Sequence, residues 1–202
     1  MDRINILAEN LRNKGYDVQC FESRNPATDF LDERLDRMQI GIGGSKTVEE
    51  MKLYEILCHH NTVYWHDRKP EELTVMETRQ AAFRADVYIS SVNAISLDGC
   101  IVNIDATGNR VAAISFGPGE IYLIIGKNKI TENLDDAIYR ARNVAAPLNA
   151  RRLNRKTPCA VNADKCYDCN SPERICRNFS IIKERPFGSN YHIILINENL
   201  GY

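Results

Sequence analysis

Apolar residues recur every three or four positions in several stretches of the chain, the spacing that gathers them on one face of a helix. Ile4, Leu7 and Leu11 form the first such stretch, and Gly15 ends it. Further helices with this pattern are expected to begin at Asn25, Thr47, Pro70 and Asn133. Each of these helices has one apolar face, so each must pack against another element.

Polar residues and prolines suggest where these helices begin and end. Thr47 and Glu50 form a capping-box pattern, which predicts that one helix starts at Thr47. The helix that opens at Pro70 is expected to turn Met76 and Phe83 inward. The last helix is expected to end at Pro147, because proline has no backbone N–H group to continue it.

Short β-prone runs separate the predicted helices, at residues 17–21, 38–42 and 62–65. This alternation predicts a parallel sheet with helices on its faces. Residues 121–125 are almost uniformly apolar, as in a strand buried on both sides, and residues 179–183 and 192–196 are late strands. The sequence therefore predicts an α/β fold.

Between residues 86 and 126 the β-prone runs are separated by turn residues at 98–99, 107–109 and 117–119. The runs follow one another so closely that no helix is expected among them. This segment therefore predicts a meander, and the sheet should be mixed but largely parallel.

Length and composition point to one domain that spans residues 1–202, since 44% of its residues are hydrophobic. The formal net charge of −1 gives no basic field for nucleic acid or an acidic membrane surface. No stretch has the roughly 20 apolar residues that membrane insertion requires, and the beginning lacks the apolar core of a signal peptide. A cytoplasmic protein is expected, without nucleic acid or membrane partners.

A glycine loop with hydroxyl side chains joins a predicted strand to a predicted helix, and its residues are Gly43, Gly44, Ser45 and Thr47. Backbone N–H groups in such a loop can bind an anion or a polar ligand. The loop matches neither the P-loop nor the dinucleotide fingerprint, which disfavours ATP and NAD. A tight turn that binds nothing remains an alternative.

A second candidate binding segment follows, at residues 98–110. Asn103 and Asp105 alternate with apolar residues and should share one face of a strand, with Asn109 and Arg110 at the following turn. Such a group of amide, carboxylate and guanidinium groups can bind a small anion, and Asp98 or Asp105 could act as a proton acceptor. Ordinary turn chemistry explains the same residues equally simply.

Four cysteines are gathered in a polar segment at residues 158–177: Cys159, Cys166, Cys169 and Cys176. Metal–sulfur bonds would supply the stability that a segment poor in apolar residues cannot obtain from burial. An iron–sulfur cluster and a zinc ion both accept four cysteine ligands. A redox-active pair formed by Cys166 and Cys169, or reduced structural thiols, are further alternatives.

Many short motifs in a fixed order resemble the lactate-utilisation (LUD) domain family. They lie at residues 43–45, 85–87, 93–95, 98–99, 102–105, 108–111, 116–118, 126–130, 143–149 and 171–176. The resemblance implies a three-layer α/β/α sandwich, as in the sugar-phosphate isomerase and CoA-transferase superfamily. It also implies a role in bacterial oxidation of L-lactate to pyruvate beside an iron–sulfur partner, and we include Asn93 among the ligand-binding residues.

Three functions remain open on these grounds. The first is a component of lactate oxidation that binds a small anionic metabolite, carries an iron–sulfur cluster and works with an oxidoreductase partner protein. The second is an isomerase- or transferase-like enzyme that acts on phosphosugars or CoA esters and contains a structural zinc. The third is a non-catalytic assembly or regulatory module. The four histidines have no metal-site or triad spacing, so no hydrolase is indicated.

Overall fold

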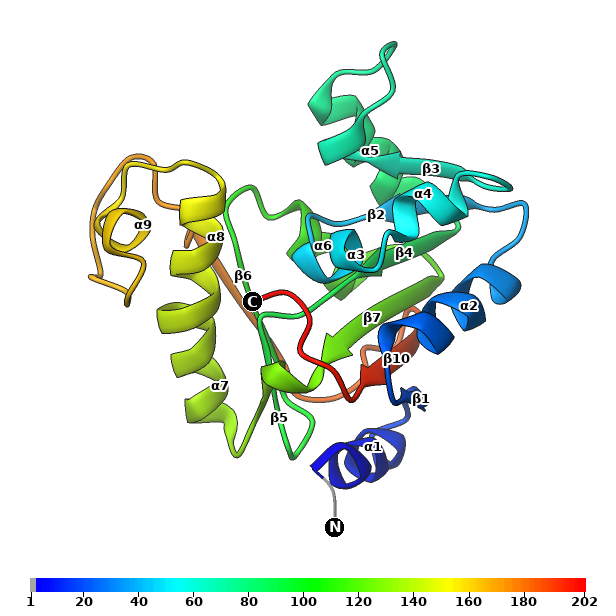
Figure 1. The fold of residues 1–202 in the computed structure, drawn as a ribbon, viewed down its shortest axis with the longest axis horizontal. Coiled ribbons are helices and arrows are strands. Elements are labelled where there is room, and N and C mark those ends of the chain that lie inside the picture. Colours follow the sequence, from blue (N-terminus) through cyan, green and yellow to red (C-terminus); the bar gives the residue numbers. More distant parts are fainter. Residues whose placement is uncertain (1–2) are drawn as a thin grey trace.

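The computed structural model describes residues 3–202 and is built on a central parallel sheet (Figure 1). The sheet has six strands in the order β1-β10-β7-β4-β2-β3, and each recorded pairing is parallel. The strands are β1 (Asp17–Phe21), β2 (Gln39–Ile42), β3 (Thr62–Trp65), β4 (Val87–Ser90), β7 (Glu120–Gly126) and β10 (Asn190–Ile196).

Helices cover both faces of this sheet. One face carries α1 (Arg3–Asn13), α5 (Val75–Arg84) and α6 (Asn109–Phe116), and the other carries α2 (Arg24–Arg34), α3 (Lys46–Glu50) and α4 (Leu53–Leu57). Successive side chains of β7 point to opposite faces of the sheet, and both faces are apolar. Leu123 packs in the first of these cores and Ile124 in the second, and both side chains are fully buried. The predicted three-layer α/β/α fold is confirmed.

A second sheet of four strands lies beside the first, in the order β8-β5-β6-β9. Its strands are β5 (Ala94–Ser96), β6 (Ile101–Asp105), β8 (Ile130–Thr131) and β9 (Asn178–Ile182). β6 pairs antiparallel with β5 and β9, whereas β5 and β8 are parallel. The expected mixed pairing is thus found in this second sheet.

A long helical segment covers one face of the second sheet (Figure 1). It consists of α7 (Leu134–Arg140), one π-helical stretch (Ala141–Ala145) and α8 (Ala146–Arg152), and a short helix, α9 (Pro158–Asn162), follows it. Asn133 caps α7 as expected, with its side-chain oxygen 2.9 Å from the backbone nitrogen of Asp136.

The expectation that Pro147 ends this helical segment is wrong. The backbone N–H of Ala146 bonds to the carbonyl oxygen of Ala141, five residues earlier, so the turn before the proline is wider than an α-helical turn. The wider turn is compatible with a proline at the start of α8, and the helix continues to Arg152.

The expectation that residues 86–126 contain no helix is also wrong, because α6 begins at Asn109. Asp105 accepts hydrogen bonds from the backbone N–H groups of Thr107 and Gly108, at 3.0 and 2.9 Å, and Gly108 has a φ of +89°. The polar residues that resemble a hairpin turn therefore form the entry to a helix.

Two predicted helix starts are shifted in the structure. Ser45, not Thr47, caps α3, and the left-handed residue Lys52 (φ +55°) separates α3 from α4. Thr74 and Glu77 form the capping box of α5, well after Pro70. Met76 and Phe83 are 54% and 37% exposed, so the expectation that they turn inward is wrong.

Two short 3-10 turns, His66–Arg68 and Lys127–Lys129, follow β3 and β7. Within residues 3–202, no helix is both long enough and apolar enough to cross a bilayer.

Candidate functional site

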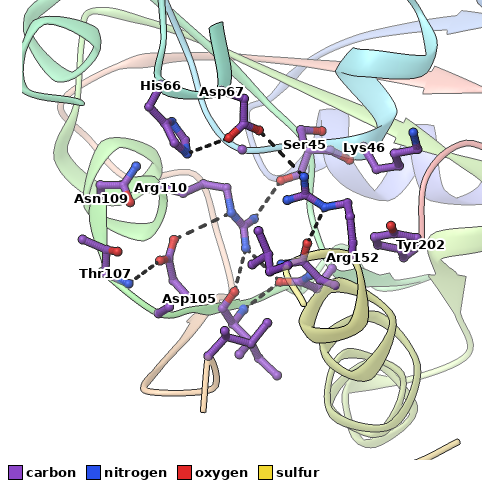
Figure 2. A pocket seen from close by; sticks show the side chains of 18 of the residues that line it. Ser45, Lys46, His66, Asp67, Asp105, Thr107, Asn109, Arg110, Arg152 and Tyr202 are labelled. Atoms are coloured by element: carbon purple, nitrogen blue, oxygen red, sulfur yellow. Dashed lines mark hydrogen bonds and ion pairs between the residues drawn. The ribbon is translucent and has the colours of Figure 1, made fainter. Parts of the chain in front are cut away.

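A cavity of about 200 Å³ opens at the carboxyl ends of the parallel strands (Figure 2). Ser45 follows β2, His66 follows β3, Asn93 follows β4 and Lys129 follows β7, and all four line the cavity with Arg110 of α6. Carboxyl ends of neighbouring parallel strands meet at one edge of a sheet, where α/β proteins commonly bind ligands. The structure thus brings the glycine loop and the Arg110 segment together at one site.

Cationic side chains outnumber carboxylates around this cavity. The cations are Lys46, Arg79, Arg110, Arg152 and Arg155. The carboxylates are Asp67 and Asp105. A concave surface with this excess of positive charge attracts anions.

The glycine loop reaches the cavity through Gly44 and Ser45, which line it, whereas Gly43 lies behind them. The backbone N–H of Gly43 bonds to the carbonyl oxygen of Ile89, and a Cβ atom there would lie 2.7 Å from the Tyr88 hydroxyl oxygen. Only glycine allows this close approach between β2 and β4. Ser45 uses its hydroxyl as an acceptor for the Val48 N–H at 3.3 Å. Gly43 thus shapes the loop, and Gly44 and Ser45 are the residues exposed to a ligand.

Arg110 fixes the cavity wall with hydrogen bonds to the protein itself (Figure 2). Its Nη1 donates to the Ser91 carbonyl oxygen at 3.0 Å and to Asn103 Oδ1 at 2.6 Å. Its Nη2 donates to Asn93 Oδ1 at 2.9 Å and to the Ile104 carbonyl oxygen at 2.8 Å. Because the terminal guanidinium donors are engaged in this way, Arg110 contributes positive charge and rigidity rather than open donors.

Asp105 lies next to this network, and its side chain is 10% exposed. Its Oδ1 accepts the two backbone bonds at the entry to α6, and its Oδ2 lies 3.8 Å from Arg110 Nε. Asn109 lines the cavity beside it. Of the two carboxylate oxygens, Oδ2 is therefore the one available to a ligand or a proton.

Two other arginines that line the cavity form fewer hydrogen bonds to the protein through their guanidinium groups than Arg110 does. Arg152 donates from Nε to Asn149 Oδ1 at 3.0 Å, and its Nη1 lies 3.9 Å from Asp67 Oδ2. Arg79 has a buried Nε without a hydrogen-bond partner among residues 3–202. An unsatisfied buried donor is costly, and an anion in the cavity could satisfy it.

His66 lies at the same edge, with Nε2 3.6 Å from Asp67 Oδ1 (Figure 2). Burial lowers the pKa of His66 because the cavity wall removes water from the imidazolium form. Asp67 opposes this shift, and Arg79 adds to it. The imidazole is therefore kept neutral at physiological pH.

Lys129 is a buried lysine with hydroxyl partners. Its Nζ lies 2.8 Å from Thr47 Oγ1 and 2.9 Å from Ser91 Oγ, and only 4% of the residue is exposed. Burial, with repulsion from Arg140 and Arg110, lowers the pKa of Lys129 to about 7. Thr47 does not line the cavity but positions this amine.

The other predicted site residues do not face the cavity. Asp98 lies in the β5–β6 hairpin, where it accepts hydrogen bonds from Ser96 and from the Cys100 thiol, and the Ser96 bond lowers the pKa of Asp98. Asn103 lies behind Arg110 and is 1% exposed. The structure thus separates Asp98 from Asp105.

All four clustered cysteines line a second cavity of about 200 Å³. Cys159 lies on α9, Cys166 and Cys169 lie on the following loop, and Cys176 lies just before β9. None of the four forms a disulfide. The cysteines that are clustered in the sequence thus line one cavity. As their side chains are placed, no group of three or more His, Cys, Asp or Glu residues within 3–202 could hold a metal ion.

Hydrogen-bond donors surround the sulfur atoms of this second cavity. Cys166 Sγ lies 3.4 Å from the Asp168 backbone nitrogen and 3.8 Å from Arg142 Nη2. The Cys176 side chain raises the pKa of Arg174 through a hydrogen bond. N–H groups of this kind can also donate to metal-bound sulfur atoms, and such hydrogen bonds tune iron–sulfur centres.

A family model of the LUD domain matches residues 4–196 of the sequence. The chain belongs to the LUD-domain family. The family is associated with lactate utilisation, which agrees with the resemblance seen in the short motifs. A search of curated proteins finds no match.

The fold of this LUD domain is similar to the crystal structure of a DUF162 family protein from Deinococcus radiodurans. The TM-score is 0.54, and the likeness covers 98% of this chain and 99% of the other at 10% sequence identity. At this identity the likeness concerns the fold.

Several residues of the LUD-domain cavity are not among those predicted from the sequence: His66, Asp67, Arg79, Lys129 and Arg152. A usable signal existed for three of them. His66 and Asp67 directly follow a predicted strand, and Lys129 shortly follows another, and the carboxyl ends of parallel strands commonly carry ligand-binding residues. Arg79 and Arg152 come from helices and have no such signal.

Proposed function

We propose that this LUD domain is a component of bacterial lactate oxidation that binds a small hydroxy acid or oxo acid in the cationic cavity. We further propose that Cys159, Cys166, Cys169 and Cys176 hold an iron–sulfur cluster. The observation that carries this proposal is a wall between two cavities: Ile175 lines both the cationic and the cysteine cavity. Helix α8 also contributes residues to both cavities.

The two faces of α8 show how close the cavities are. Asn149 and Arg152 line the cationic cavity, whereas Ala146 and Ala150 line the cysteine cavity. The two sites therefore lie on neighbouring faces of one helix, and one isoleucine lines both of them. A ligand that gives up electrons and a centre that accepts them benefit from this proximity.

The ligand is expected to be a small carboxylate. Arg152 and the unsatisfied Nε of Arg79 offer donors, and Ser45 and Gly44 form the facing wall. Arg110, which the sequence suggested as the carboxylate partner, orients Asn93 instead. Asp105 Oδ2 is the proposed acceptor for the hydroxyl proton.

The cysteine cavity suits a group of several atoms. Its volume of about 200 Å³ is shared by the other side chains that line it, so it has room for a cluster as well as for one zinc ion. When bound, an iron–sulfur cluster takes up and releases single electrons. Oxidation of a hydroxy acid removes two electrons and two protons. The hydroxyl proton goes to Asp105, and the C2 hydrogen leaves with both electrons as hydride to a redox cofactor, which an iron–sulfur oxidoreductase partner is proposed to supply as the final electron acceptor.

Anaerobic purification tests the cluster. We expect iron and sulfide in the protein and a visible absorption band that bleaches on reduction. Cys169→Ser should lose both, whereas Cys58→Ser, at an exposed position outside the cavity, should keep them. Stoichiometric zinc without colour would contradict the cluster and favour a structural metal.

Thermal shift assays test the ligand. We expect stabilisation by lactate or pyruvate. The same cationic lining can also accept a phosphate, so stabilisation by phosphosugars or CoA esters alone would favour an isomerase- or transferase-like enzyme. No response to any of these anions, with a tight complex with a partner protein, would favour a non-catalytic assembly module.

A further inference from the structure

Lys129 is not explained by anion binding alone. The residue lines the cationic cavity, and its Nζ donates to the hydroxyl oxygens of Thr47 and Ser91. No carboxylate within residues 3–202 forms an ion pair with it. Buried lysines are usually paired with a negative charge, so this amine requires another explanation.

The hydrogen bonds around Lys129 indicate how many protons the amine carries. The Thr47 hydroxyl donates its proton to the Leu200 carbonyl oxygen at 3.2 Å, and the Ser91 hydroxyl donates to the carbonyl oxygen of Ile124. Both hydroxyl oxygens are therefore acceptors toward Nζ, and they use two N–H bonds. A neutral amine has two N–H bonds and one lone pair, which match this arrangement.

A charged ammonium group would fit this position less well. Burial removes water from it, and the guanidinium groups of Arg110 and Arg140 repel it, whereas among residues 3–202 Glu50 favours the charged form with the smallest effect. The two hydroxyl acceptors match the two N–H groups of a neutral amine, which keeps one lone pair free at a residue that lines the cationic cavity.

The chain packs closely around this amine. Gly201 has a φ of +62°, and a Cβ atom there would lie 2.6 Å from Thr47 Oγ1 and 3.3 Å from Lys129 Nζ. Glycine lets the backbone lie against both side chains without displacing them. The amine is therefore held in one place rather than on a mobile side chain.

We propose that the Lys129 amine condenses with the carbonyl group of a small anionic aldehyde or ketone, such as a 2-oxo acid, and holds it as an imine. The amine nitrogen forms a bond to the carbonyl carbon, the carbonyl oxygen leaves as water, and no oxidant or reductant is consumed. Arg152 and Arg79 hold the anionic group. This inference rests on the proposed use of the cavity for a small anion.

Reductive trapping tests the imine. The full-length protein is incubated with pyruvate and cyanoborohydride, which supplies hydride to an imine, and the intact mass and peptides are measured. We expect one reduced pyruvate per chain, on Lys129. With its pKa at about 7, this residue should react about a hundredfold or more faster at pH 7 than an exposed lysine.

Matched variants locate the reaction. Lys129→Met should lose the adduct, whereas Lys127→Gln, in the same turn but outside the cavity, should keep it. Peptide mapping of the wild-type protein identifies the lysine even if Lys129→Met does not fold. An adduct spread over exposed lysines, or none at Lys129, would overturn the imine.

Repeating the trapping with other carbonyl compounds defines the ligand and separates this inference from the proposed function. A phosphate-bearing aldehyde in place of pyruvate tells whether a carboxylate or a phosphate is preferred, and faster trapping with either supports the imine. An uncharged ketone should react much more slowly. If lactate stabilises the protein but pyruvate gives no adduct, the imine is wrong and the proposed function stands.

Discussion

The two cavities of this LUD domain are about equally large but are built in different ways. The cationic cavity is formed at the ends of four parallel strands, and Arg110 ties its walls together. The cysteine cavity is formed by a short helix and loops around a small apolar cluster of Ala150, Ala160 and Ile175. We therefore expect the first to be rigid before any ligand binds, and the second to need a bound group to hold its parts together.

The largest expected effect concerns the cysteine cavity. Cys166→Ser with Cys169→Ser should remove the bound metal centre, and residues 154–177 should then lose protection from hydrogen exchange by about a hundredfold or more, because metal–sulfur bonds replace a core there. The central sheet should stay protected. Cys58→Ser is the control, and unchanged protection of 154–177 would show that both regions are equally self-supporting.

Removing Arg110 should affect the other cavity through global stability. Arg110→Gln loses the hydrogen bonds to two carbonyl oxygens and two asparagine side chains, all in the wall of the cationic cavity. We expect the free energy of unfolding in urea to fall by about 3 kcal/mol, as when buried charged hydrogen bonds are broken. Arg110→Lys should restore only part of it, since lysine cannot reproduce the planar fork. A loss in ligand binding without a loss in stability would contradict the wall role.

Arg152→Gln should weaken anion binding with little change in stability. Its side chain is 29% exposed and the residue lines the cavity, so we expect affinity for lactate or pyruvate to fall about tenfold, as measured by calorimetry. Arg151→Gln on the same helix does not touch the cavity and serves as control. Equal losses in both variants would indicate a general charge effect.

The smallest effect is a pH dependence from His66. Burial lowers its pKa in the folded state, so below the ordinary imidazole pKa the unfolded chain binds a proton that the folded chain does not. Stability is therefore complete above that pH and falls below it, by at most about 1.4 kcal/mol per pH unit. His66→Gln should flatten the slope in urea titrations at several pH values, and an unchanged slope would remove His66 as its source.

Sequence periodicity was sufficient for the main architecture because both faces of the central sheet are apolar. The strands at 17–21 and 62–65 lie where the pattern predicts them. The entry to α6 was missed because glycine and asparagine serve both hairpin turns and helix starts. Only the contacts of the Asp105 side chain distinguish the two.

The candidate site was predictable where it follows strands and unpredictable where it depends on packing. Gly44, Ser45 and Arg110 share a cavity as the motifs suggest. Arg110 is occupied by protein acceptors, and Lys129 is buried without an ion pair to any of residues 3–202. Both are three-dimensional facts that no local spacing encodes.

The π-helical stretch at Ala141–Ala145 sets which side chains face which cavity. Each residue of an α-helix turns the chain by about 100°. Deleting one residue from this stretch would leave a regular helix whose second half is rotated by about that angle. Arg152 would then turn away from the cationic cavity, and Ala150 would turn away from the cysteine cavity. One extra residue in a helical turn is thus enough to align two chemically different cavities along one helical segment.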